Sequence, residues 1–187
     1  MDAGRAHITG ASGSGTTTLG RALASRWSVP HADADDYFWL PTSPPYVEKR
    51  PAAERLGLMR KLFLGRDAWV LSGSVMDWGD ELVATFDAVV FLSTDHEHRL
   101  ARLRARERQR YGDRIGPGGD LEAGHLEFLT WAAGYENPGF DGRSRARHEE
   151  WLSGLACPVL RLDGSTPVAD LVAEVLAWEK PPFRPAS

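Results

Sequence analysis

The chain contains a single cysteine, Cys157, among its 187 residues. An internal disulfide is therefore excluded, and clustered cysteine ligands for zinc are absent. Thiol-poor, disulfide-free chains are typical of a reducing compartment, so we expect a cytoplasmic protein. Cys157 stands just before an apolar segment, where a free cysteine behaves as a small buried hydrophobic residue.

Long apolar runs are also missing. No stretch reaches 18 consecutive apolar residues, and the amino terminus has no apolar segment between a basic region and a small-residue cleavage site. The pattern predicts neither a membrane helix nor a signal peptide. With 42% hydrophobic and 26% charged residues, the composition is that of a globular protein, and the length predicts one domain over residues 1–187.

Lysine is scarce, since three lysines stand against nineteen arginines, and the formal net charge is -4. A negative net charge gives no general attraction to nucleic acid or to anionic membranes, so we expect neither as a partner. Arginine suits two-pronged contacts to phosphate, although a genome-wide codon bias also produces such a ratio. The sequence leaves a monomer and a homodimer equally open.

Apolar strand-like segments alternate with amphipathic helical segments along the chain. Strands are expected at residues 5–9, 31–35, 68–71, 88–92 and 159–162. Helices are expected at residues 17–27, 51–64, 99–109, 121–135, 145–155 and 168–178, with breaks at prolines 41–45 and at the glycine-rich segment 112–119. This alternation predicts an α/β fold, with helices on both faces of a parallel sheet of about five strands.

A glycine-rich loop lies between the first expected strand and the first expected helix. Residues 10–17 have the spacing of a G-x-x-x-x-G-K-[ST] phosphate loop, except that Thr16 stands where lysine is expected. Glycines let backbone N–H groups converge on an anion, and the following helix adds the positive end of its dipole. We therefore predict that the loop binds nucleotide phosphates, with Thr17 as the hydroxyl that holds Mg²⁺. The residues assigned to nucleotide binding are Gly10, Ser12, Gly13, Ser14, Gly15, Thr16, Thr17 and Thr18.

Two other interpretations of the loop remain open. One is a strand-to-helix turn that binds no ligand. The other is a dinucleotide site, which is the weaker of the two because Gly10, Gly13 and Gly15 do not have G-x-G-x-x-G spacing.

Taken together, these features resemble the compact P-loop kinases related to shikimate kinase, gluconate kinase and adenylate kinase. The resemblance covers nearly the whole chain and implies a P-loop NTPase fold, with a lid at about residues 104–140 and an acceptor-binding segment at about residues 33–64. It also implies transfer of the γ-phosphoryl group of ATP, with Mg²⁺, to a small metabolite or nucleotide. The segment 162–168 is similar to the loop that flanks the adenine in such kinases, which assigns Gly164 to the nucleotide site.

The same resemblance assigns the acceptor side. Asp33 and Asp35 are similar to the paired acids of shikimate kinase, so Asp33 is assigned to acceptor binding and Asp35 to orienting the acceptor hydroxyl or taking its proton. A helix cap is the competing explanation for Asp35. Arg50 is placed like the acceptor-binding arginine of the family, while Gly73 and Asp77 follow the third expected strand, at the edge where ligands collect. The Ser-Gly-Ser turn at Gly73 replaces the triple glycine of shikimate kinase, which argues against shikimate as the acceptor.

A cationic helix face is the last candidate feature. Arg102, Arg106 and Arg110 recur every four residues and so lie on one face of the expected helix. The resemblance places this helix in the lid, whose arginines reach over the transferring phosphoryl group, and it makes Arg106 and Arg110 catalytic candidates. A solvated basic face is the alternative.

Thr16 is the main departure from the family pattern. The usual lysine stabilises charge on the β- and γ-phosphates. Either another cation replaces it, such as a lid arginine or Arg50, or catalysis is weak or absent. Two further functions therefore remain open, namely a nucleotide-binding module without phosphoryl transfer and a nucleoside triphosphate hydrolase. The sequence does not identify the acceptor.

Overall fold

The computed structural model describes residues 1–179 and contains one five-stranded parallel sheet with the strand order β2-β3-β1-β4-β5. The strands are β1 (Arg5–Gly10), β2 (His31–Asp33), β3 (Trp69–Ser72), β4 (Ala88–Ser93) and β5 (Val159–Asp163). Because β1 is central, the loop that follows it opens at the middle of the carboxyl edge of the sheet. The expected α/β fold is confirmed.

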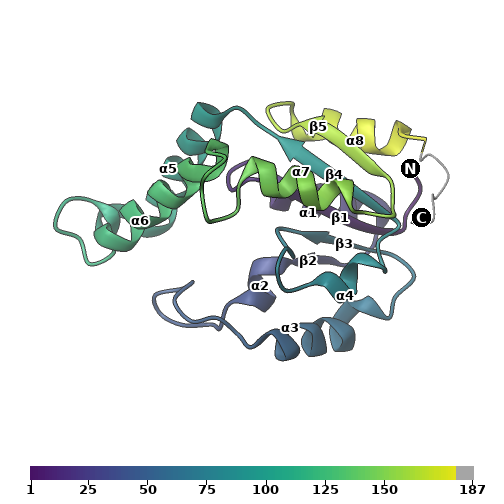
Figure 1. Cartoon of the computed structure of the whole chain (residues 1–187), viewed down its shortest axis with the longest axis horizontal. Helices are drawn as coiled ribbons and strands as arrows, with labels where there is room; N and C mark the ends of the chain where they lie inside the picture. Colours follow the sequence, from purple (N-terminus) through teal and green to yellow (C-terminus); the bar gives the residue numbers. More distant parts are fainter. Residues whose placement is uncertain (180–187) are drawn as a thin grey trace.

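Helices cover both faces of this sheet (Figure 1). They are α1 (Thr16–Trp27), α2 (Ala34–Phe38), α3 (Ala52–Met59), α4 (Asp80–Val83), α5 (His96–Tyr111), α6 (Glu122–Ala133), α7 (Arg145–Ser153) and α8 (Val168–Ala177). Short π and 3-10 segments occur at η1 (Arg60–Leu64), η2 (Gly112–Ile115) and η3 (Gly134–Glu136). None of the helices within residues 1–179 is long and apolar enough to cross a membrane.

Two hydrophobic clusters hold the layers together. Leucines of α1 and α8 pack with Ile8, Val70 and Val90 on one face, whereas α3, η1 and α7 pack with Trp69, Leu71 and Val89 on the other. The strands β3 and β4 are buried on both faces, which explains why they appear in the sequence as nearly continuous apolar runs.

The helices α5 and α6 form a hairpin that projects away from the sheet (Figure 1). A small apolar cluster of Leu100, Leu103 and Ala132, with Phe128 beside it, holds the two helices together. This α5–α6 hairpin corresponds to the segment that we expected to form the lid. It remains close to the phosphate loop at its base, where Leu103 lies beside Gly13.

The structure corrects the predicted second strand. Residues 31–35 were expected to form a strand that ends in acids, but β2 ends at Asp33 and α2 begins at Ala34. The Asp33 side chain accepts a hydrogen bond from the Asp35 backbone N–H at 3.2 Å and so caps α2. Asp35 therefore lies in the first turn of a short helix and not at the end of a strand.

Candidate active site

The phosphate loop connects β1 to α1 in a conformation that glycine favours. The φ angles of Gly13 and Gly15 are 85° and 101°, in the left-handed region. A Cβ built on Gly13 would meet the Arg99 carbonyl oxygen at 2.7 Å, whereas one built on Gly15 would have only an Arg102 guanidinium nitrogen nearby, at 3.9 Å. Gly13 thus packs against the protein, and Gly15 borders the open space at the start of α1. This geometry fits an anion held by backbone N–H groups and the helix terminus.

Thr17 and Asp33 link the loop to the acidic segment. The Thr17 hydroxyl donates a hydrogen bond to Asp33 Oδ2 at 2.7 Å. Both groups are hard oxygen donors of the kind that suits Mg²⁺. Residues 1–179 hold no cluster of three His, Cys, Asp or Glu side chains that could bind a metal. A magnesium ion beside Thr17 would therefore depend on phosphate oxygens and water for most of its ligands, as Mg²⁺ does in many nucleotide sites.

A cavity of about 310 Å³ lies beside the loop. It is lined by loop and α1 residues, by Arg102 and by residues 164–168, so the structure places Gly164 at its wall. Arg102 donates a hydrogen bond to the Gly164 carbonyl at 2.8 Å. Leu19 and Leu171 supply apolar lining next to the polar loop. A cavity of this size, partly polar and partly apolar, suits the nucleoside part of a nucleotide.

Two arginines that are distant in sequence reach Ser12 in the loop. Arg99, which is fully buried in α5, donates to the Ser12 carbonyl at 3.0 Å. Arg143, which follows η3, donates to the Ser12 hydroxyl at 2.8 Å. Burial lowers the pKa of both guanidinium groups, while Glu136 raises that of Arg99 and Asp35 raises that of Arg143. The loop is thus surrounded by positive charge although it contains no lysine.

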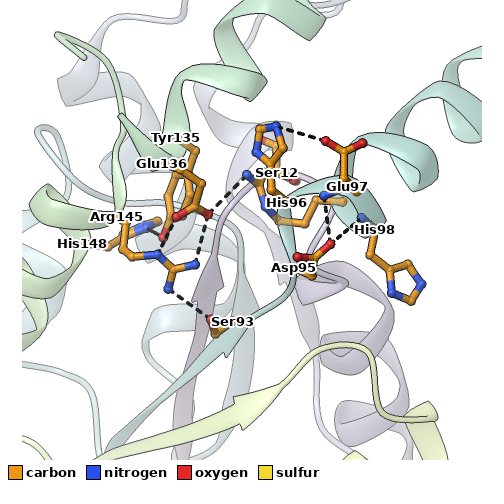
Figure 2. A network of polar contacts seen from close by, with 11 residues as sticks. Ser12, Ser93, Asp95, His96, Glu97, His98, Tyr135, Glu136, Arg145 and His148 are labelled. Carbon is orange, nitrogen blue, oxygen red and sulfur yellow. Dashed lines mark hydrogen bonds and ion pairs between the residues drawn. The ribbon is translucent and has the colours of Figure 1, made fainter. Parts of the chain in front are cut away.

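A polar network ties the end of the α5–α6 hairpin to the sheet (Figure 2). Glu136 accepts two hydrogen bonds from Arg145, at 2.7 and 3.0 Å, and Arg145 donates to Ser93 Oγ at 3.2 Å. Next to them, the Tyr135 hydroxyl lies 2.8 Å from His148 Nδ1. Arg99 packs over the ring of Tyr135, with 4.8 Å between the guanidinium carbon and the ring centroid. The network therefore fixes Arg99 under the loop.

Asp35 lies among charges of both signs. Its side chain is exposed to solvent, yet the surrounding protein raises the pKa of its carboxyl group by desolvation. Asp33 and Asp36 raise this pKa further, whereas Arg143 and Arg106 lower it. A carboxyl group with a raised pKa is a stronger base than an ordinary aspartate, which suits proton abstraction.

The other predicted residues are distributed as follows. Arg106 influences Asp35 from the hairpin and pairs with Glu107 at 3.4 Å, whereas Arg110 is exposed at the far end of α5. Arg50 donates to the carbonyl oxygens of Tyr37 at 3.0 Å and Trp39 at 3.4 Å. Its guanidinium group thus holds the backbone at the end of α2.

Gly73 and Asp77 lie on the acidic side of the site. A Cβ on Gly73 would stand 3.4 Å from Asp33 Oδ1, so the turn after β3 packs directly against the acids. Asp77 pairs with Arg147 at 2.7 Å. The structure therefore brings together the loop, Asp33, Asp35 and Gly73, while Asp77 stands in an ion pair at the rim.

Two arginines that we did not predict also belong to this region. Arg55 is buried, packs over Phe38 at 4.0 Å and over Trp78 at 5.3 Å, and donates to the Arg50 carbonyl. Arg143 lies at the loop. Neither arginine belongs to a motif or to a periodic face in the sequence, so no local signal indicated them.

Comparison with known proteins gives one close relative and several similar folds. No protein-family model matches the chain. The uncharacterized protein YqaC of Bacillus subtilis (strain 168) is 45% identical over 172 residues, which cover 92% of this chain and 95% of YqaC.

Solved structures of kinases have the same fold at low identity. Shikimate kinase from Acinetobacter baumannii, in complex with shikimate, matches with a TM-score of 0.53 and 18% identity, over 93% of this chain and 91% of that one. Shikimate kinase from Bacteroides thetaiotaomicron matches with a TM-score of 0.51 and 19% identity, over 91% of this chain and 95% of that one. A sugar kinase from a Janibacter species matches with a TM-score of 0.51 and 17% identity, over 94% of each chain. At such identities the similarity establishes the P-loop kinase fold alone.

Proposed function

The chain belongs to the same family as protein YqaC of Bacillus subtilis, and we propose that it is an ATP-dependent phosphotransferase acting on a small metabolite or nucleotide. One observation carries the proposal. The hydrogen bond from Thr17 to Asp33 joins the phosphate loop to the acidic segment, which supports Asp35, in the first turn of α2, as the group that would face an acceptor at the end of a bound triphosphate.

The nucleotide side supports ATP as the donor and Mg²⁺ as the metal. The loop N–H groups and the α1 terminus would hold the phosphates, and the cavity beside Gly164 would hold the nucleoside. Thr17 and Asp33 would position Mg²⁺, which neutralises phosphate charge when it is bound.

Asp35 would act on the acceptor. The acceptor hydroxyl oxygen forms a bond to the γ-phosphorus while the bond between that phosphorus and the bridging oxygen of ADP breaks. The hydroxyl proton passes to the Asp35 carboxylate and is later lost to water. ATP and the alcohol thus become ADP and the phosphate ester. The cap of α2 is supplied by Asp33, which supports a role for Asp35 other than capping.

The test begins with a screen of small metabolites and nucleotides for acceptor-dependent release of ADP, followed by assay of Asp35→Asn on the acceptor that is found. This variant keeps the side-chain shape and removes the basicity, so turnover should fall on the order of 10² to 10⁴-fold. The affinity for ATP and the melting temperature should stay close to those of the wild type. Asp36→Asn, in the adjacent exposed residue, is the matched control and should lower turnover far less, because Asp36 makes the smallest of the contributions that shift the pKa of Asp35. Wild-type turnover in Asp35→Asn would remove Asp35 from the mechanism.

A further inference from the structure

A cation stands over the third residue of the lysine-free loop. Arg143 comes from 131 residues further along the chain, and its Nη2 donates to the Ser12 hydroxyl at 2.8 Å. We propose that Arg143 is the catalytic cation that replaces the loop lysine, by contacting the γ-phosphoryl group from the side that faces Asp35. This inference rests on the proposed function of the same site.

The Arg143 guanidinium group is held in place from two sides. Ser12 accepts its hydrogen bond, and the ring of Trp131 in α6 lies against it, with 5.1 Å between the guanidinium carbon and the ring centroid. The side chain is partly buried. Packing of this kind restricts the rotamers of a long side chain, so less entropy is lost when it binds a phosphate.

Within the part of the chain that the structure describes, the Arg143 guanidinium group forms no ion pair with a carboxylate. Its hydrogen-bond partner is a neutral hydroxyl. Its charge and that of Asp35 nevertheless influence each other. The two groups therefore lie near each other but too far apart for a direct ion pair. A phosphoryl group at the end of the loop would enter between the cation and the base, as transfer requires.

The other cations of the region have different partners. Arg99 is fully buried beneath the loop and lies 3.7 Å from Glu136. Arg102 is bound to the Gly164 carbonyl beside the nucleoside cavity, and Arg50 is bound to carbonyl groups at the end of α2. Arg106 pairs with Glu107 and acts on Asp35 from the hairpin. Among these arginines, Arg143 combines a direct hydrogen bond to the loop with the absence of any ion pair within residues 1–179.

An arginine is chemically suited to this position. Its planar group can donate two parallel hydrogen bonds to phosphate oxygens, and it stays protonated in proteins. Thr16 has no charge and a short side chain, so it cannot stabilise negative charge on the phosphoryl group in this way. In related chemistry an arginine that meets the transferring phosphoryl group contributes roughly 10³ to 10⁵-fold to turnover.

The test measures binding and needs no acceptor. With Mg²⁺ present, calorimetry compares the affinities for ADP and for ADP with aluminium fluoride, a mimic of the transferring phosphoryl group. Wild type should bind the mimic more tightly than ADP. In Arg143→Gln the ratio of the affinity for the mimic to the affinity for ADP should fall on the order of 10²-fold or more. The affinity for ADP itself should change less than about threefold. Arg143→Lys keeps the charge without the two-pronged geometry and should lose less.

Two further variants isolate the role of charge at the loop. Adding Thr16→Lys to Arg143→Gln should restore part of the preference, because the new lysine supplies a cation at the usual place. Arg5→Gln is the matched control, since it removes an arginine paired with Asp87 at the other end of β1, and it should leave the preference unchanged. Rescue by Thr16→Lys would also show that Arg143→Gln had folded.

The two proposals fail in different ways. If wild type binds no nucleotide, the proposed function falls and the role of Arg143 falls with it. If wild type prefers the mimic and both Arg143→Gln and Arg143→Lys keep that preference in full, only the role of Arg143 is overturned. Equal binding of the mimic and ADP by wild type would also contradict a cation poised for the phosphoryl group.

Discussion

Two buried histidines should make the protein sensitive to mild acid. His7 in β1 is fully buried, and burial lowers its pKa from 6.5 to about 4. His148 in α7 is equally buried, and burial together with nearby arginines lowers its pKa to about 3. Both side chains are neutral in the folded protein at pH 5, whereas in the unfolded chain they are protonated.

The size of the effect follows from these pKa values. When the folded pKa lies below the unfolded pKa, protonation favours the unfolded chain, so stability is full above pH 6.5 and is lost as the pH falls. Below the unfolded pKa of 6.5, each such histidine lowers the free energy of unfolding by about 1.4 kcal/mol per pH unit. Between pH 7 and pH 5 each histidine therefore lowers it by about 2 kcal/mol. The pair removes about 4 kcal/mol, a large share of the roughly 5 to 15 kcal/mol by which domains are stable.

The assay is urea unfolding at a series of pH values between 7 and 5, for wild type, His7→Leu and His98→Gln. His7→Leu should be less stable at pH 7, because the Nδ1 hydrogen bond to the Leu71 carbonyl and the stacking on Phe86 are lost. Its loss of stability between pH 7 and pH 5 should be about 2 kcal/mol, half that of wild type. His98 is exposed, so its variant should keep the full dependence.

The result that would refute this reasoning is a wild-type free energy of unfolding that stays constant from pH 7 to pH 5. The same pH dependence in His7→Leu as in wild type would refute the assignment to His7 alone.

Two more predictions concern the site. Gly15→Val should abolish nucleotide binding in a calorimetric titration, because φ at this position is 101° and the added side chain would occupy the open space at the start of α1; binding at the wild-type level would place the nucleotide elsewhere. Arg106→Gln should lower turnover at least about tenfold more than Arg110→Gln, because Arg106, unlike Arg110, contributes to the pKa of the Asp35 carboxyl group. Equal small losses in both variants would favour a solvated basic face.

The sheet and the phosphate loop were predictable because their signals are local. Buried parallel strands appear as continuous apolar runs, so the strand expected at 68–71 lies within one residue of β3. The glycine spacing of residues 10–17 likewise indicated the turn between the first strand and the first helix. The short helix α2 was missed because five residues are too few for a helical period, and the expected strand ran through it.

The arginines were harder to predict because their roles depend on tertiary contacts. The four-residue repeat correctly places Arg102, Arg106 and Arg110 on one helix, but the projecting hairpin gives each a different environment. Arg143 reaches Ser12 only because η3 and α7 return to the sheet next to the loop. A contact between residues so distant in sequence leaves no pattern in either segment.

The two oxygens of Asp33 serve different helices, since Oδ2 accepts from Thr17 of α1 and Oδ1 accepts from the first turn of α2. Because one carboxylate joins the two, the loop and the segment that carries Asp35 cannot shift independently without losing a hydrogen bond. A ligand at the loop that displaces either hydrogen bond would therefore alter the energy of the segment that carries Asp35, and by thermodynamic linkage a ligand on that segment would alter the affinity of the loop by the same factor. A single aspartate is thus the shortest route by which the two halves of the site can be cooperative.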